Sequence, residues 1–191
     1  VSEVGGRTFR DLARTAVHVE HPTLGVDPRD PEHLMVGNDG GVYVSRDRGE
    51  HWLWQANLPA MQLYAAAVDM QEPFYHVYGG TQDNGSWGGP VGTRFSDGVS
   101  NEDWIFTAGG DGFHSQVDPT NPDIIYAESQ YGVLYRMDRG TGERRRIQPW
   151  QPQEGERPAY RWNWSAPLLI SPHNPHTLYF AANVVFRSPD R

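Results

Sequence analysis

A short phrase recurs four times in the 191-residue chain and constrains its fold more than any other feature. Each copy has an apolar residue, a small polar residue and a closing proline, and the copies begin at Val26, Val68, Val117 and Ile170. Proline fixes φ and cannot donate to a strand ladder, so each phrase suits a turn after a strand. The copies start roughly 40 to 55 residues apart, a period typical of repeats that each form one small sheet. We therefore expect four similar units.

Short runs of β-branched and aromatic residues follow each phrase, as expected of strands bounded by turns. Second strands are expected at residues 33–36, 75–78, 123–127 and 177–180, and third strands at 41–44, 132–135 and 184–187. Residues 9–16 are the one helix-like stretch, and they lack a sustained apolar face. The pattern predicts an all-β fold of four-stranded antiparallel units without helices.

An octapeptide, Ser-x-Asp-x-Gly-x-x-Trp, lies downstream of the first phrase at residues 45–52. At a hairpin tip the short Asp47 carboxylate can accept hydrogen bonds from nearby backbone N–H groups, and Gly49 can adopt a positive φ. The final Trp52 can then pack back against the sheet. We therefore interpret Asp47 as the cap of a turn, with no catalytic role.

Three weaker copies accompany this octapeptide. Residues 2–9 keep its serine, its glycine and a final aromatic residue but have Val4 in place of the aspartate. The other two copies retain Asp138 with Gly140, and Ser188 with Asp190. Each aspartate follows its recurring phrase by about 20 residues, so the octapeptide belongs to the same repeat. We expect the chain to be a window on a longer polypeptide that is cut within the motif at both ends.

The octapeptide resembles the Asp-box, or BNR repeat, of β-propellers such as sialidases, sortilin-like receptors and xyloglucanase-type hydrolases. Phrases at residues 58–64, 80–87, 109–112 and 163–167 are similar to BNR-repeat proteins described as glycosyl hydrolase-like or sortilin-like. The resemblance implies a β-propeller in which Ser45, Asp47, Gly49, Trp52 and their equivalents are structural positions on hairpins. It implies a fold more than a reaction, because one fold hosts many functions.

Four blades of a single propeller region, residues 1–191, are expected from the repeat. They span about residues 17–58, 62–108, 112–150 and 163–191, with residues 7–12 as a candidate outer strand for the last blade. Propellers usually have about 4 to 8 blades, and rings of four are uncommon. The region is therefore expected to be part of a larger propeller, with the remaining blades as its partners.

Charge and composition exclude several function classes. A net charge of −8 disfavours a general nucleic-acid surface, and no apolar run approaches the roughly 20 residues needed to cross a bilayer. The chain has no cysteine, so it has no disulfide and no thiolate metal site. The histidine pairs 18/21 and 173/176 lack a third ligand nearby. Neither a metal nor a cofactor is expected.

Three glycine-flanked aspartates are the catalytic candidates, namely Asp39, Asp83 and Asp111. A propeller ligand usually meets the loops at one mouth of the channel, and these residues occupy turns expected there. Asp-Gly and Asp-Asn-Gly are also favoured hairpin turns, which offers a purely structural reading of Asp39 and Asp83. Asp111 precedes an innermost strand, where a ligand can approach glycine backbone, but a glycine-rich bulge has the same sequence.

The candidate ligand-binding residues are amides, one histidine and tryptophans near the same turns: Gln82, Gln130, His114, Trp87, Trp162 and Trp164. Tryptophan can stack on a sugar face, although it is also a common core residue. Trp162 and Trp164 alternate along a strand, so one indole is expected to be buried while the other points elsewhere.

The first functional interpretation is a secreted, periplasmic or cell-surface module that recognises carbohydrate or protein. The second is a glycoside hydrolase, whose two carboxylates must lie about 5–5.5 Å or about 6.5–9.5 Å apart. Its candidates are Asp39, Asp83, Asp111 and Glu128, of which Asp39 also resembles a xyloglucanase-type aspartate preceding Gly-Gly. A sialidase is disfavoured because its arginine cluster is missing. The third interpretation is a structural spacer.

Overall fold

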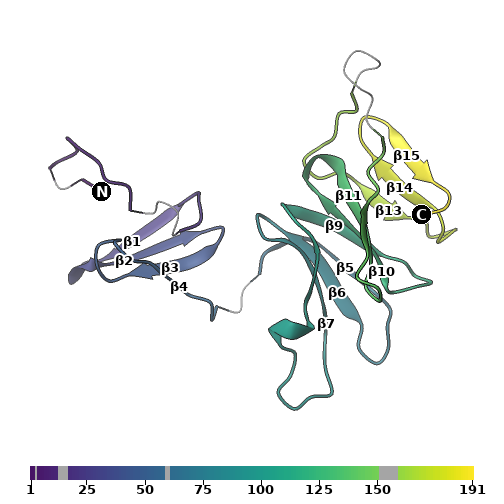
Figure 1. Ribbon diagram of the computed structural model, residues 1–191, viewed down its shortest axis with the longest axis horizontal. Coiled ribbons are helices and arrows are strands. Elements are labelled where there is room, and N and C mark those ends of the chain that lie inside the picture. Colours follow the sequence, from purple (N-terminus) through teal and green to yellow (C-terminus); the bar gives the residue numbers. More distant parts are fainter. Residues whose placement is uncertain (3, 13–16, 59–60, 151–158) are drawn as a thin grey trace. The chain divides into compact units, whose positions relative to one another are not determined.

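In the computed structural model, residues 1–2, 4–12, 17–58, 61–150 and 159–191 are described (Figure 1). The chain divides into two compact units, Val1–Ala60 and Met61–Arg191. Both are built from antiparallel strands, and together they contain four sheets. No helix in the described part of the chain is long and apolar enough to span a membrane.

The first unit contains one four-stranded sheet in the order β1-β2-β3-β4. Its strands are β1 (Thr23–Asp27), β2 (Asp30–Asn38), β3 (Gly41–Ser45) and β4 (Leu53–Trp54). The recurring phrase forms the β1–β2 turn, where the Asp27 carboxylate accepts the Arg29 N–H at 2.9 Å. Along β2, Leu34 and Val36 are buried while Met35 is exposed, as the alternation of side chains in a strand requires.

The second unit contains three sheets. The second sheet is β5 (Leu63–Val68), β6 (His76–Thr81), β7 (Gly85–Pro90) and β8 (Ile105–Ala108). The third sheet is β9 (Gly112–Val117), β10 (Ile124–Ser129), β11 (Val133–Asp138) and β12 (Arg144–Arg146). The fourth sheet is β13 (Leu168–Ile170), β14 (Leu178–Ala181) and β15 (Val185–Ser188). In each sheet, neighbouring strands follow the order of the chain.

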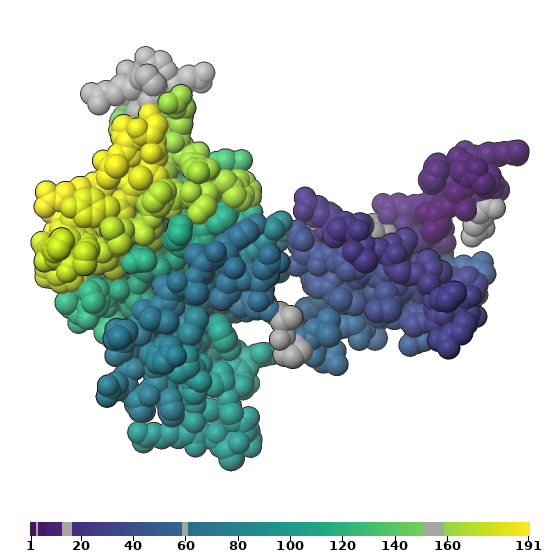
Figure 2. Space-filling view, turned by 180° about the vertical axis from the view of Figure 1, so that it is seen from behind, coloured from purple at the N-terminus to yellow at the C-terminus, as the bar shows by residue number. Residues whose placement is uncertain are grey.

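The first strands of these three sheets are neighbours, because β9 packs against both β5 and β13 (Figure 1). Successive sheets whose first strands line a common centre are the arrangement of propeller blades. The third and fourth sheets form one continuous body in the space-filling view (Figure 2). The all-β architecture is thus consistent with part of a propeller.

The structure differs from the expected elements at several points. The fourth sheet has three strands among the described residues, in the order β13-β14-β15, and β15 ends at Ser188. Residues 7–12 form no strand, since Val1 and Arg10 exchange backbone hydrogen bonds of 2.7 and 2.8 Å and close a loop. Two single-turn 3₁₀ helices also occur, η1 (Asn101–Asp103) and η2 (Gln130–Gly132).

The main core lies between the third and fourth sheets. Its buried side chains are Ile124, Tyr126, Leu134, Ala166, Leu168, Ile170, Leu178 and Phe180. The second and third sheets meet differently, through glycine backbone: a Cβ on Gly80 would lie 2.0 Å from the carbonyl carbon of Gly112. Side-chain packing thus joins one pair of sheets, and direct backbone contact joins the other.

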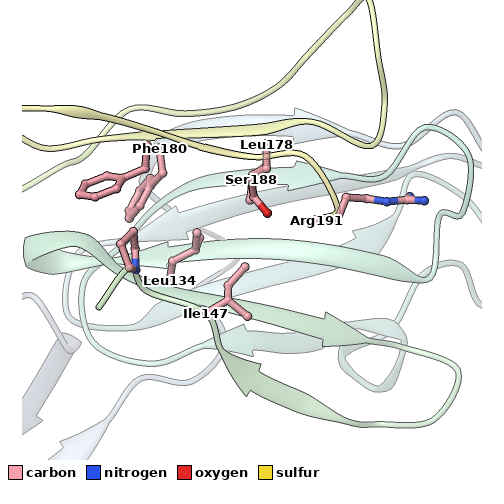
Figure 3. Close-up of a pocket in the computed structure, with 8 residues that line it drawn as sticks. Leu134, Ile147, Leu178, Phe180, Ser188 and Arg191 are labelled. Atoms are coloured by element: carbon pink, nitrogen blue, oxygen red, sulfur yellow. The ribbon is translucent and has the colours of Figure 1, made fainter. Parts of the chain in front are cut away.

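A small apolar hollow remains between the third and fourth sheets (Figure 3). Leu134, Ile147, Leu178 and Phe180 line it, and Arg191 lies at its edge. Its volume of about 100 Å³ is well below the roughly 300–1,000 Å³ of small-molecule sites. The hollow is therefore a packing gap and does not define a ligand site.

Candidate functional site

The octapeptide forms a tightly hydrogen-bonded turn between β3 and β4. The buried Ser45 Oγ accepts the Gly49 N–H at 2.8 Å and donates to Asp47 Oδ1 at 2.8 Å. Asp47 Oδ1 also accepts the His51 N–H at 3.0 Å, while Gly49 has a φ of +83°. Hydrogen bonds from the His51 backbone, the His51 side chain and Ser45 lower the pKa of Asp47 to about 2. The Asp47 carboxylate is therefore engaged within its own turn.

The degenerate copy at the start of the chain shares this turn geometry. Ser2 Oγ accepts the Gly6 N–H at 2.7 Å, just as Ser45 accepts from Gly49. Gly6 has the same φ of +83° as Gly49. The serine–glycine bond thus forms although Val4 stands in the aspartate position.

The remaining two copies differ from each other. Ser188 Oγ donates to Asp190 Oδ1 at 2.8 Å, which repeats the bond within the octapeptide. Asp138 instead accepts the Thr141 N–H at 3.1 Å, and the nearby glycine with positive φ is Gly142. The copy around Asp138 lacks the serine, and its turn is correspondingly different.

At the end of the second unit that lies opposite the turns around Asp138 and Asp190, hydrogen bonds join the turns of successive sheets. Asp111, 5% exposed, accepts the backbone N–H of Asp83 at 2.7 Å through Oδ1. The Asp111 N–H donates to Gln130 Oε1 at 3.0 Å, and the Tyr131 N–H donates to the carbonyl of Trp164 at 3.3 Å. Hydrogen bonds therefore connect the β6–β7 turn with the segment before β9, and that segment with the β10–β11 turn. The β10–β11 turn is also bonded to the segment before β13.

The turn between the second and third strand of every sheet carries an amide side chain, from Asn38, Gln82, Gln130 and Asn183. Asn38 donates to the carbonyl of His18 at 3.0 Å, and Asn183 accepts the Arg161 N–H at 2.9 Å. In both cases the partner lies in the segment leading into the same sheet, as it does for Gln130 with Asp111. Gln130 thus has a bond within the protein in addition to its candidate role toward a ligand.

Four aromatic rings of the second unit touch one after another, and we call them the aromatic row. They are Tyr64 on β5, Phe113 on β9, Trp164 in the segment before β13, and Tyr131 in η2. Tyr64 stacks on Phe113 at 4.9 Å, and Phe113 meets Trp164 edge to face at 6.0 Å. Tyr131 meets Trp164 edge to face at 4.9 Å. Phe113 is buried, but Tyr64, Trp164 and Tyr131 are 44%, 41% and 58% exposed. The row therefore presents aromatic surface beside the hydrogen-bonded turns.

Local backbone geometry explains where the end of the row lies. Tyr131 has a φ of +58°, a conformation that non-glycine residues rarely adopt. The next residue, Gly132, lies against the Trp162 ring, which a Cβ would approach to 2.2 Å. Trp162 itself packs against Phe180 at 4.9 Å. Trp162 is thus half-buried between rings, whereas Trp164 faces outward.

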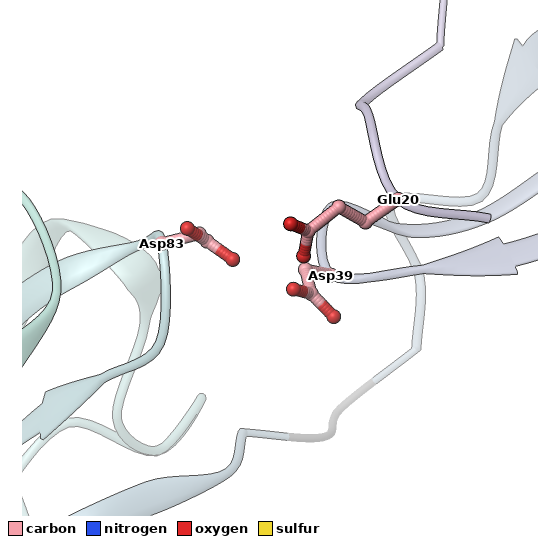
Figure 4. A group of neighbouring side chains, drawn as sticks. All are labelled: Glu20, Asp39 and Asp83. Atoms are coloured by element: carbon pink, nitrogen blue, oxygen red, sulfur yellow. The ribbon is translucent and has the colours of Figure 1, made fainter. Parts of the chain in front are cut away.

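The remaining predicted residues lie near these turns or in the first unit. Trp87, on β7, donates through Nε1 to the carbonyl of Asn84 at 2.6 Å, and His114 is half-buried on β9. Asp83 is exposed at the β6–β7 turn (Figure 4). In the first unit, Asp39 lies at the β2–β3 turn, and its carboxylate comes within 4.8 Å of Glu20 (Figure 4).

Glu128 is a fully buried carboxylate that is hydrogen-bonded to the segment that carries Trp164. It accepts the backbone N–H of Ala166, two residues after Trp164. Its Oε2 has no hydrogen-bond partner among the described residues. Burial raises the pKa of Glu128 to about 7, and hydrogen bonds from the backbones of Ala166 and His114 oppose this rise. Without an exposed oxygen, Glu128 cannot reach a ligand in this conformation.

A second polar cluster lies at the other end of the second and third sheets. Arg139 bonds Asp123 at 2.8 Å and approaches His76 Nε2 at 3.3 Å. Arginine only donates, so Nε2 accepts and the proton of the neutral imidazole lies on Nδ1. That atom is 3.0 Å from Asp69 Oδ2, off the ideal hydrogen-bond direction. The charged groups of this cluster thus contact one another, and the contacts link the two sheets.

Sequence reasoning singled out Trp164 but missed Tyr64, Phe113 and Tyr131. One signal was available, because Tyr64 and Phe113 are both the second residue of the first strand of their sheets. Aligning the first strands would have shown two aromatic residues at one position. Tyr131 carried no comparable signal, since its positive φ depends on the packing of the neighbouring glycine.

No protein-family model matches the chain, and no curated protein matches it. Among solved structures, it is similar to an auxiliary nutrient binding protein from Bacteroides thetaiotaomicron (12% identity, TM-score 0.43, 88% of this chain and 38% of that one). A GH74 xyloglucanase from Xanthomonas campestris is also similar (21% identity, TM-score 0.41, 87% and 28%).

An ancestral GH74 enzyme is a third similar structure (16% identity, TM-score 0.45, 88% of this chain and 22% of that one). The chain spans less than two fifths of the length of each of these three proteins.

Proposed function

We propose that the chain is part of a larger Asp-box β-propeller that acts outside the cell as a recognition module for carbohydrate. The supporting observation is the aromatic row, whose exposed rings come from β5, from η2 and from the segment before β13. Sugar rings have apolar faces that stack on Trp and Tyr, and their hydroxyl groups require nearby polar partners. Trp164 and Tyr131 supply the apolar surface in this proposal.

The polar partners are proposed to be Asp83, Gln82 and the backbone of the adjoining turns. Asp83 and Gln82 are exposed, and their turn is bonded to Asp111. Turns that are already fixed lose little conformational freedom when a ligand binds, which favours affinity. In this proposal, the polar groups of these turns orient a glycan chain across the row.

Binding to a glycan array, followed by titration of each hit, tests this proposal. We expect Trp164→Ala to weaken binding at least about fivefold, since it removes a stacking surface worth about 1 kcal/mol or more. Trp150→Ala is the matched control, because Trp150 is 65% exposed and lies outside the row. Equal loss in both variants, or no glycan bound, would contradict the proposal. Binding to a peptide array alone would indicate protein recognition instead.

Glycoside hydrolysis is the second candidate function, and the bond between the Asp83 backbone and the Asp111 carboxylate favours it. That bond brings two aspartates from adjacent sheets together at one end of the second unit. Hydrolysis needs a pair of carboxylates on either side of the scissile bond. Asp39 remains a third candidate from the sequence.

The hydrolase candidate is tested by turnover of a polysaccharide panel by the longest available form of the protein. Asp39→Asn, Asp83→Asn and Asp111→Asn are compared singly with Asp97→Asn, an exposed aspartate of the β7–β8 connection. Substitution of a catalytic aspartate should lower turnover by orders of magnitude while leaving glycan binding in place. No turnover of any substrate, or equal turnover in all four variants, would rule out hydrolysis at these residues.

A further inference from the structure

We propose that Glu128 is the positioning residue of the aromatic row: through Ala166 it fixes the segment that carries Trp164, and its protonation regulates ligand binding there. The inference rests on the proposed recognition function for its effect on binding. Its effect on Trp164 is independent of any ligand.

The hydrogen bond of Glu128 joins two elements. The residue lies on β10, and it accepts the Ala166 N–H from the segment before β13. Ala166 is fully buried and is followed by Pro167, whose fixed φ stiffens the chain. Trp164 is itself 41% exposed, and it meets the third sheet through the Phe113 ring and the Tyr131 N–H. The Glu128 bond adds a buried carboxylate attachment of the same segment to the third sheet.

The protonation state of this carboxylate changes the strength of the attachment. An ionised carboxylate accepts N–H bonds roughly twice as strongly as a neutral acid does. Burial is the main cause that raises the pKa of Glu128 to about 7, so both states occur near neutral pH. His114 is the titratable residue of β9 at this contact, and it meets Glu128 through its backbone. No charged side chain of the described residues contributes to this pKa.

Fluorine NMR of the chain labelled with fluorotryptophan is the primary test. Trp164→Phe identifies the Trp164 resonance among those of the seven tryptophans. We expect that resonance to titrate with a midpoint near pH 7 in the unaltered chain and not in Glu128→Gln, which keeps an amide oxygen for Ala166. Glu102→Gln, at an exposed position of η1, should titrate like the unaltered chain. A Trp164 resonance that titrates equally in Glu128→Gln would overturn the proposal.

Glycan affinity supplies the second readout, with a hit from the array as the probe. Binding by the unaltered chain should tighten about fivefold from pH 6 to pH 8, because the charge-assisted bond is stronger by about 1 kcal/mol. Glu128→Gln should stay flat, and near-ultraviolet circular dichroism checks that it is folded. Flat binding by the unaltered chain would overturn the regulatory part. If no glycan binds at all, recognition fails as a function, while the NMR result still decides whether Glu128 positions Trp164.

Discussion

At the scale of single residues, Asp47 and Glu128 show how the surroundings of a carboxyl group decide its behaviour. Asp47 is half-exposed and accepts hydrogen bonds from its own turn, which lower its pKa to about 2. Glu128 also accepts backbone N–H groups, but burial raises its pKa to about 7. The same type of hydrogen bond therefore accompanies opposite shifts, and solvent exposure determines which effect dominates.

We expect His51→Ala to raise the pKa of Asp47 part of the way from about 2 toward 3.8. The substitution removes the bond between His51 Nδ1 and Asp47 Oδ2 at 2.7 Å but leaves the backbone N–H of residue 51 in place. Because the folded pKa is lowered, Asp47 stabilises the fold above about pH 4, and this stability is lost as the pH falls through about 2. Carbon NMR of the carboxyl group measures the titration. His173→Ala is the control, and an unchanged pKa of Asp47 in His51→Ala would contradict the expectation.

Glu128 should affect stability with the opposite sign. Its folded pKa of about 7 exceeds the ordinary value of 4.5, so its contribution is fully present below pH 4.5 and is lost as the pH rises to about 7. The loss is at most about 3 kcal/mol by linkage. Urea unfolding at a series of pH values should show the unaltered chain losing stability relative to Glu128→Gln over that window. Parallel curves for the two proteins would show that Glu128 does not titrate as described.

At the scale of strands and turns, local chemistry predicted the elements whose formation depends on nearby residues. The third strand expected at residues 41–44 is β3 (Gly41–Ser45), and the second strand expected at 177–180 is β14 (Leu178–Ala181). No residue range was predicted for the third strand of the second sheet, β7 (Gly85–Pro90), because three of its residues are glycines. Glycine is required there by residues elsewhere in the chain, since a Cβ on Gly88 would lie 2.3 Å from the Tyr78 ring. Contacts of that kind leave no local signal, which is also why Tyr131 of the aromatic row was missed.

Gly80→Ala should be severely destabilising, because its Cβ would lie 2.0 Å from the backbone of Gly112. Backbone on both sides cannot move aside as a flexible side chain can, so the second and third sheets would have to separate. We expect a loss of about 3 kcal/mol or more, in the range of severe overpacking. Gly109→Ala is the matched control, since its Cβ would meet its nearest neighbour at 3.6 Å. Urea unfolding compares the two, and similar stabilities would contradict the close approach.

At the scale of the whole molecule, the two units differ in how much apolar surface they bury. The second unit has a cluster of eight buried residues between its third and fourth sheets. In the first unit Leu34 and Val36 are buried on β2, while Leu53 and Trp54 of β4 are 68% and 55% exposed. A single small sheet that leaves such residues exposed is at the margin of independent stability. The units should therefore differ in their ability to fold alone.

We expect residues 61–191, produced as a separate protein, to unfold cooperatively in urea, and residues 1–60 to show no cooperative transition. A third protein, residues 61–150, serves as the control for the core. It lacks Ala166, Leu168, Ile170, Leu178 and Phe180, which belong to the cluster. Removing several buried side chains costs about 2 kcal/mol or more each, which exceeds the stability of a typical small domain. Residues 61–150 should thus lose the cooperative transition, and its persistence would show that the second and third sheets, joined through Gly80 and Gly112, are stable without that core.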